Sequence, residues 1–218
     1  MRGLDRGQRP ALLISECQNA ITNVAHVDSP LARQVHERGI IARINHLADA
    51  FRAHRLPVIH CTIAVPSFDG FVVNCALAAQ IKKQGRLIQG SRDAAIHDEL
   101  VVAPSDILSE RMHGMAAFSG TELEWILRGH GVQTVVYAGV STNVALPGGA
   151  TEAVARAFNV IVVEDCTAGG TTESHQMQVT QHLPLLATVT RTSELVHELN
   201  SQRWASASGG TNAPSRIT

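Results

Sequence analysis

Short apolar runs alternate with helical patterns along most of this 218-residue chain, and this alternation limits the possible folds more than any other feature. Such runs predict buried strands, and the longer patterns between most of them predict the helices of repeated βαβ units. The chain is therefore predicted to form three α/β/α layers around a mostly six-stranded parallel sheet. The predicted strands are residues 11–15, 57–61, 106–108, 134–138, 160–163 and 187–189.

Three segments between these strands predict the clearest helices. Residues 32–54 carry apolar side chains at three- and four-residue steps, which predicts one buried face. Residues 121–128 and 143–158 predict two more helices, and Pro147 would lie in the first turn of the second, where proline is tolerated. The expected core face of the first helix contains Ile40, Ile41, Ile44, Leu47 and Phe51.

Length and composition predict one globular domain, residues 1–200. Hydrophobic residues make up 44% of the chain, enough for one sizeable core. No apolar stretch reaches the roughly 18 to 20 residues of a membrane span, and residues 1–10 lack the apolar core of a signal peptide. A soluble cytoplasmic protein is expected. Residues 201–218 are rich in Ser, Gly and Ala, which predicts a flexible tail.

Charge and metal-ligating residues point to a small-molecule partner. The net charge is −1 without a Lys/Arg cluster, which argues against nucleic acid and anionic membranes as partners. Four cysteines lack C-x-x-C spacing, and eleven histidines form no metal-binding motif, so neither a metal nor another cofactor is expected. The cysteines are Cys17, Cys61, Cys75 and Cys166.

Residues 65–100 form the longest weakly patterned region. A connection of this length in a compact domain is often a functional loop or lid. Phe68 and Phe71 could line a substrate pocket, or they could simply attach the loop to the body of the domain.

A strand that runs into a helix stands out at residues 135–145, which read V-V-Y-A-G-V-S-T-N-V-A. Gly139 ends the apolar run, and Ser141, Thr142 and Asn143 are residues that commonly cap a following helix. The exposed N–H groups of a helix start can stabilise a developing oxyanion.

This segment resembles the active-site turn of the isochorismatase-like hydrolases, or cysteine hydrolases, in which G-V-x-T-N-V precedes a nucleophilic cysteine. Ala145 occupies the cysteine position. Residues 11–19, A-L-L-I-S-E-C-Q-N, are similar to the family's opening strand, with Glu16 in place of its aspartate. Residues 110–123 resemble K-x-x-x-S-A-F-x-G-T-x-L, and by spacing Met112 falls on the lysine of the Asp-Lys-Cys triad.

The resemblance implies that the first and fourth strands are neighbours where the strand order reverses, the usual place for a ligand cleft. Glu16 and the turn of Val140, Ser141, Asn143, Val144 and Ala145 would then converge. The family's cis peptide maps onto Val140–Ser141, and an oxyanion hole could survive without its nucleophile. The resemblance also implies a homodimer or homotetramer, to which the apolar face of Leu195, Val196 and Leu199 could contribute.

The candidate catalytic residues are Glu16, Arg111 and His113. A partly buried Glu16 could serve as a general acid or base, whereas an ion pair with Arg111 would be a purely structural alternative. His113 could transfer a proton or be an ordinary surface residue. The predicted substrate pocket contains Phe68, Phe71, Met112, Met115 and Phe118, and its methionines favour a fairly apolar substrate.

Three hypotheses follow. The first is a hydrolase or lyase that acts on a small, fairly apolar carbonyl, amide or enol-ether compound by non-covalent chemistry at Glu16, since a thiol mechanism at position 145 is excluded. The second is a non-catalytic small-molecule-binding protein. The third is an amide hydrolase that uses Cys17 or Ser141 as a relocated nucleophile.

Overall fold

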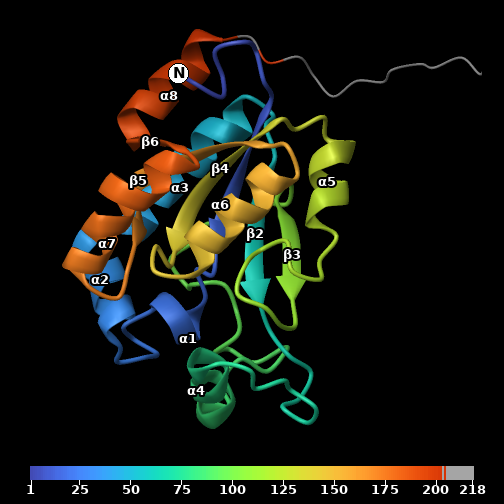
Figure 1. Ribbon diagram of the computed structural model, residues 1–218, viewed down its shortest axis with the longest axis vertical. Helices are drawn as coiled ribbons and strands as arrows, with labels where there is room; N and C mark the ends of the chain where they lie inside the picture. Colours follow the sequence, from blue (N-terminus) through green and yellow to red (C-terminus); the bar gives the residue numbers. More distant parts are fainter. Residues whose placement is uncertain (203, 205–218) are drawn as a thin grey trace, which may run out of the picture.

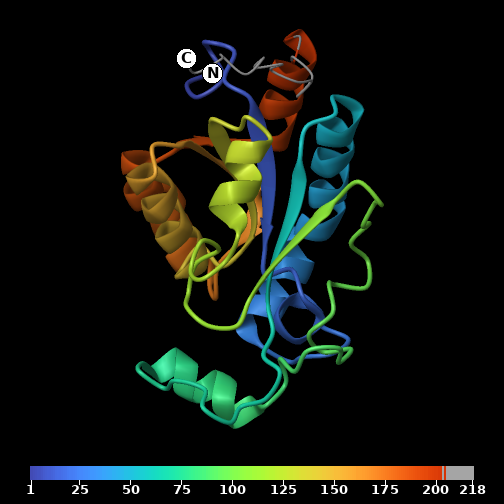
Figure 2. The same ribbon diagram turned by 90° about the vertical axis from the view of Figure 1, so that its right-hand side faces the viewer.

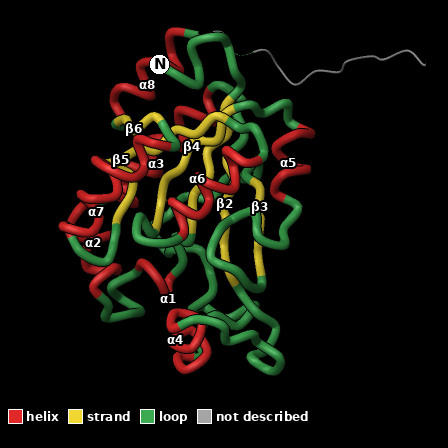
Figure 3. The backbone as a smooth tube through the Cα atoms, in the orientation of Figure 1, coloured by secondary structure: helices red, strands yellow, loops and turns green. Residues whose placement is uncertain are grey.

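The computed structural model describes residues 1–202 and 204, and a six-stranded sheet runs through its centre (Figures 1 and 3). Every strand pair is parallel, and the strand order is β3-β2-β1-β4-β5-β6. All six predicted strands are present, which confirms the α/β prediction. They are β1 (Pro10–Ser15), β2 (Val58–Ile63), β3 (Ile107–Arg111), β4 (Thr134–Val140), β5 (Asn159–Ala168) and β6 (Thr188–Thr190).

Helices cover both faces of the sheet because successive strand residues point to opposite sides. Leu12 and Ile14 of β1 pack against the face covered by α2 (Pro30–Arg38), α3 (Ile40–Ala53) and α8 (Thr192–Ser201). Ala11 and Leu13 pack toward α5 (Leu123–Gly129) and α6 (Ala145–Ala155). Figure 2 shows α3 and α6 on opposite sides of the strands. On the α6 side the chain also forms α7 (Thr172–Met177), a π-helical turn (Gln178–His182) and a 3-10 turn (Leu183–Leu185).

The helix predicted over residues 32–54 is two helices. Ser29 caps α2, because its hydroxyl accepts a hydrogen bond from the Ala32 N–H at 3.1 Å, and Pro30 opens it. Gly39 adopts the left-handed conformation, with φ of 60°, and separates α2 from α3. The five predicted core residues of α3 are all buried. The two later helices begin two residues after their predicted starts.

The apolar face of α8 belongs to the protein's own core. Leu195 and Leu199 are fully buried against the sheet, so the prediction that this face joins subunits is wrong for these two residues. The predicted flexible tail, residues 201–218, lies outside the described residues apart from positions 201, 202 and 204. Trp204 packs against the core, and its indole N–H donates to the Leu199 carbonyl at 3.0 Å. No helix in the described part of the chain has the length and apolarity needed to cross a membrane.

A very close contact joins the carboxyl ends of β1 and β4. Ser15 lies opposite Gly139, and a Cβ atom at Gly139 would lie 2.2 Å from the Ser15 carbonyl oxygen. Gly139 also has φ of 94°, in the region that favours glycine. A side chain at position 139 would therefore push the two strands apart where the sheet order reverses.

The connection between β2 and β3 contains a helix that its weak pattern did not predict, α4 (Ala76–Gln84). Both ribbon views show α4 beyond the carboxyl ends of the strands, outside the three layers (Figures 1 and 2). Gln18, next to the short helix α1 (Asn19–Thr22), anchors this connection. Its buried amide donates to the carbonyls of Ile63 at 2.9 Å and Ala94 at 2.6 Å.

Candidate functional site

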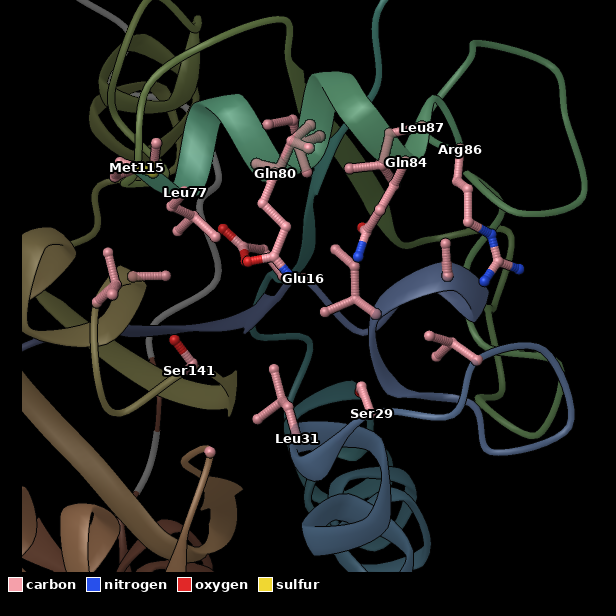
Figure 4. Close-up of a pocket in the computed structure, with 18 of the residues that line it drawn as sticks. Glu16, Ser29, Leu31, Leu77, Gln80, Gln84, Arg86, Leu87, Met115 and Ser141 are labelled. Atoms are coloured by element: carbon pink, nitrogen blue, oxygen red, sulfur yellow. The ribbon is translucent and has the colours of Figure 1, made fainter. Parts of the chain in front are cut away.

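A cavity of about 340 Å³ opens at the carboxyl ends of β1 and β4, where the strand order reverses. Glu16, directly after β1, and Ser141, directly after β4, both line it. Figure 4 shows their side chains beneath α4, which forms the opposite wall. The predicted convergence of residues more than a hundred positions apart is therefore present in the structure.

Glu16 has an unusual backbone conformation. Its φ of 51° lies in the left-handed region, which is unfavourable for a residue with a Cβ atom. Two backbone hydrogen bonds hold it there, from the Glu16 N–H to the Cys61 carbonyl at 2.8 Å and from the Gln18 N–H to the Glu16 carbonyl at 2.9 Å. Because such strained residues cluster at active sites and ligand sites, the conformation favours a functional role for Glu16.

Arg111, the last residue of β3, forms an ion pair with the Glu16 carboxylate. The Arg111 side chain is 3% exposed and that of Glu16 is 15% exposed, so the pair is largely shielded from solvent. The Arg111 Nε–H also donates to the Gly114 carbonyl at 3.3 Å. Arg111 therefore fixes one carboxylate oxygen of Glu16, while Glu16 still lines the cavity.

The spacing assigned Met112 to the position of the family's lysine, but the structure places Arg111 opposite the acid. Met112 is 53% exposed and does not line the cavity that contains Glu16. The cation beside the Glu16 carboxylate is therefore Arg111. This is the Glu16–Arg111 ion pair that was predicted as the structural alternative.

The turn after β4 contains the cis peptide Val140–Ser141 that the resemblance implied. Val140 is fully buried, whereas Val144 and Ala145 line the cavity. Ala145 is the first residue of α6, so its N–H belongs to the helix turn that lacks intrahelical acceptors. The positive end of the α6 dipole thus faces the same cavity as Glu16.

The predicted capping residues do not cap α6, since no side chain accepts from its first turn. Asn143 is exposed and lies outside the cavity lining; its side-chain oxygen accepts from the Gly170 N–H at 2.6 Å. The buried Thr142 donates its backbone N–H to the Ala168 carbonyl at 2.9 Å. These bonds attach the turn to the end of β5.

A buried polar network behind this turn was not predicted from the sequence. His175 of α7 contacts the Thr142 hydroxyl through Nδ1 at 3.2 Å and Glu164 through Nε2 at 3.3 Å. Arg38 donates to the same Glu164 oxygen at 2.8 Å. Burial lowers the pKa of His175. The pKa of Glu164 is raised by burial but lowered more by its hydrogen bonds to Arg38 and His175, so the net direction is down.

Several predicted pocket residues lie elsewhere. Phe118 is 5% exposed and stacks on Phe158 in the core, with ring centroids 6.1 Å apart, so it is not a pocket residue. Phe68 lines neither hollow near α4 and makes an edge contact with Phe71, at 5.4 Å between centroids. Phe71, Met112 and His113 line a second hollow, which adjoins the first and which Glu16 does not line.

Of the predicted pocket residues, Met115 lines both hollows. His113 is exposed and its ring lies over Gly120, where a Cβ atom would be 3.0 Å from Nε2. His113 does not line the cavity that contains Glu16. The geometry therefore favours the interpretation of His113 as an ordinary surface residue.

Most of the cavity wall comes from residues that the sequence did not single out. Leu77, Gln80, Ile81 and Gln84 of α4 line it at steps of three and four residues. Ile21, Val27 and Leu31 form the opposite apolar side. The helical period of the α4 face was a usable signal, but exposed polar residues beside it masked the pattern.

The alternative nucleophiles differ in their positions. Cys17 is 3% exposed, does not line the cavity, and its thiol pKa is raised by burial and by the neighbouring Glu16 carboxylate. A thiolate is therefore disfavoured there. Ser141 does line the cavity, but the described residues place no base in hydrogen-bond contact with its hydroxyl.

Within residues 1–202 and 204 no cluster of three His, Cys, Asp or Glu side chains could hold a metal ion.

Comparison with known proteins agrees with the geometry. The family model described as "Isochorismatase domain" matches residues 10–194. The chain is 29% identical to the ureidoacrylate amidohydrolase RutB of Agrobacterium fabrum over 171 residues, which cover 72% of this chain and 75% of that protein. It is 34% identical over 83 residues to the uncharacterized isochorismatase family protein YecD of Escherichia coli O157:H7, a match that covers 38% of this chain and 44% of that relative.

Two solved structures have the same fold. The cysteine hydrolase from Pseudomonas syringae pv. phaseolicola 1448A superposes with a TM-score of 0.79 at 20% identity, covering 88% of this chain and 93% of that one. The N-carbamoylsarcosine amidase from Thermoplasma acidophilum superposes with a TM-score of 0.68 at 25% identity, covering 84% of this chain and 96% of that one.

Proposed function

The chain belongs to the isochorismatase family, and from that premise we propose that it hydrolyses a small, fairly apolar amide-type compound without a covalent intermediate. One observation carries the proposal: the strained Glu16 shares one cavity with the first turn of α6, and no thiol lies between them because residue 145 is alanine. The names of RutB and of N-carbamoylsarcosine amidase, both amide-cleaving enzymes, favour an amide over an enol ether.

In the proposed reaction, water takes the place of the missing thiol. The water oxygen attacks the amide carbonyl carbon, and Glu16 accepts a proton from that water molecule. The N–H of Ala145 and the positive end of α6 stabilise the oxyanion of the tetrahedral intermediate. Glu16 then returns the proton to the departing nitrogen, the C–N bond breaks, and the products are a carboxylic acid and an amine.

Arg111 has a positioning role in this proposal. Its guanidinium binds one oxygen of Glu16 and leaves the carboxylate oriented in the cavity. The same ion pair is also the observation that favours the alternative function, a non-catalytic binding protein, because Arg111 already occupies one oxygen of the Glu16 carboxylate.

Replacement of Glu16 by glutamine tests the proposal. We expect Glu16→Gln to lower kcat by roughly a hundredfold or more, with a smaller change in KM, because a general base contributes about that factor. The measurement is release of ammonia from a panel of primary amides and N-carbamoyl amino acids, and release of the carbonyl product from enol ethers. Glu37→Gln is the matched control, since Glu37 lies on the exposed surface of α2.

The two candidate functions give different results. Turnover that is unchanged in Glu16→Gln would contradict the acid/base proposal. Binding of panel compounds to the wild-type protein without turnover of any of them would support the binding alternative.

A further inference from the structure

We propose that Gln80 and Gln84 of α4 bind an uncharged amide or urea group of the substrate other than the group that reacts at Glu16. This inference rests on the proposed function for the position of the reacting group. It assigns α4 the role of distinguishing substrates, which neither the motifs nor the family's triad describes.

The first argument is the way α4 faces the cavity. Leu77, Gln80, Ile81 and Gln84 recur at helical spacing, and all four line the cavity that contains Glu16. In Figure 4 the side chains of Leu77, Gln80 and Gln84 point from α4 into the cavity that contains Glu16. Ala78 is the one buried residue of this fully described helix. The inner face of α4 therefore lines the cavity and does not pack against the protein core.

The second argument is that both carboxamides are available. Neither the Gln80 nor the Gln84 side chain makes a hydrogen bond to another described residue. Each carboxamide offers two N–H donors and one carbonyl acceptor. Both glutamines are exposed and line the cavity together with Leu31, Leu77 and Ile81. A ligand group that pairs with these donors and acceptors would therefore bind in preference to an apolar one.

The third argument concerns charge. Arg86 also lines this part of the cavity, but its guanidinium makes two hydrogen bonds to Asp93, both at 2.8 Å, and one to the His26 carbonyl at 2.7 Å. Arg111 is likewise paired with Glu16. Both cations that line the cavity are thus engaged by carboxylates of the protein. A carboxylate on the substrate would find no unpaired charge here, whereas an amide would find matching groups.

Hexanamide and adipamide form a suitable probe pair, because they share an apolar chain and differ in a second terminal amide. We expect adipamide to bind the wild-type protein roughly three- to tenfold more tightly than hexanamide, as one or two net hydrogen bonds would give. In Gln80→Leu/Gln84→Leu this ratio should fall to about one. Lys83→Leu makes a similar polar-to-leucine change on α4 at a residue outside both hollows, and it should keep the wild-type ratio.

Calorimetry on the full chain measures these affinities. Each protein is measured both with Glu16 and with the Glu16→Gln substitution, so that turnover does not interfere. Equal affinity for the two probes in the wild-type protein, or an unchanged ratio in the double variant, would overturn the inference. Tighter binding of adipate than of adipamide would also overturn it. If the affinity ratio depends on Gln80 and Gln84 but no turnover depends on Glu16, the proposed function is overturned and the inference about α4 stands. The two failures are therefore distinguishable.

Discussion

Gly149 of α6 packs closely against Tyr137 of β4. A Cβ atom at Gly149 would lie 2.6 Å from the Tyr137 hydroxyl oxygen, which is buried and has no hydrogen-bond partner in the described structure. Gly149→Ala should therefore lower the free energy of unfolding by about 1–3 kcal/mol, although alanine is normally the better helix residue. In a Tyr137→Phe background the loss should be smaller, because the closest atom is gone. Urea denaturation of the four proteins in this cycle measures the coupling.

Gly148→Ala is the matched control on the same helix turn. Its Cβ atom would lie 3.4 Å from the Ala116 Cβ atom, a normal contact distance, so we expect no loss and a gain of up to about 1 kcal/mol. Equal effects of Gly148→Ala and Gly149→Ala, or a loss at Gly149 that Tyr137→Phe does not change, would contradict the proposed contact.

Helix α4 differs from α3 in how firmly it is held. Six residues of α3 are buried, whereas Ala78 is the buried residue of α4. Since few buried contacts permit local opening, the α4 amides should exchange with solvent deuterium at least tenfold faster than the central amides of α3. Saturating adipamide should slow exchange in α4 if its glutamines bind the ligand. Protection of α4 equal to that of α3 in the free protein would contradict this expectation.

At the scale of the whole molecule, three buried histidines link folding to pH. Burial lowers the pKa of His60, His97 and His175 from the ordinary value of 6.5. Below pH 6.5 the unfolded chain therefore binds more protons than the folded protein, so the free energy of unfolding should fall as the pH falls through this value. Carboxylates with a lowered pKa, such as that of Glu164, add their losses at lower pH, below the ordinary glutamate value of 4.5.

Urea denaturation between pH 7.5 and 5.5 measures this dependence. His175→Gln should reduce the slope of stability against pH, even if it also lowers stability at pH 7.5, since it removes one of the three groups. His36→Gln is the control, because His36 is exposed on α2. Stability that is constant or rises toward pH 5.5 would contradict the expected sign.

The sequence by itself determined the sheet, both helical layers and the location of the site. Strand-length apolar runs and helical periods reflect burial, which acts through local residue order, so all six strands and the core face of α3 were predictable. Glu16, Ser141 and Ala145 were also found from motifs, because each directly follows a strand or opens a helix. These features depend on near neighbours in the chain.

Tertiary structure alone decided which side chains meet. The Glu16–Arg111 pair was one of the predicted alternatives. The exposure of Met112, the place of Phe118 in the core and the packing of α8 on the sheet were not, since they depend on loop geometry and on partners distant in sequence. The wall formed by Gln80 and Gln84 was missed for the same reason. Residue order specifies which face of an element is apolar, but the folded arrangement determines what that face contacts.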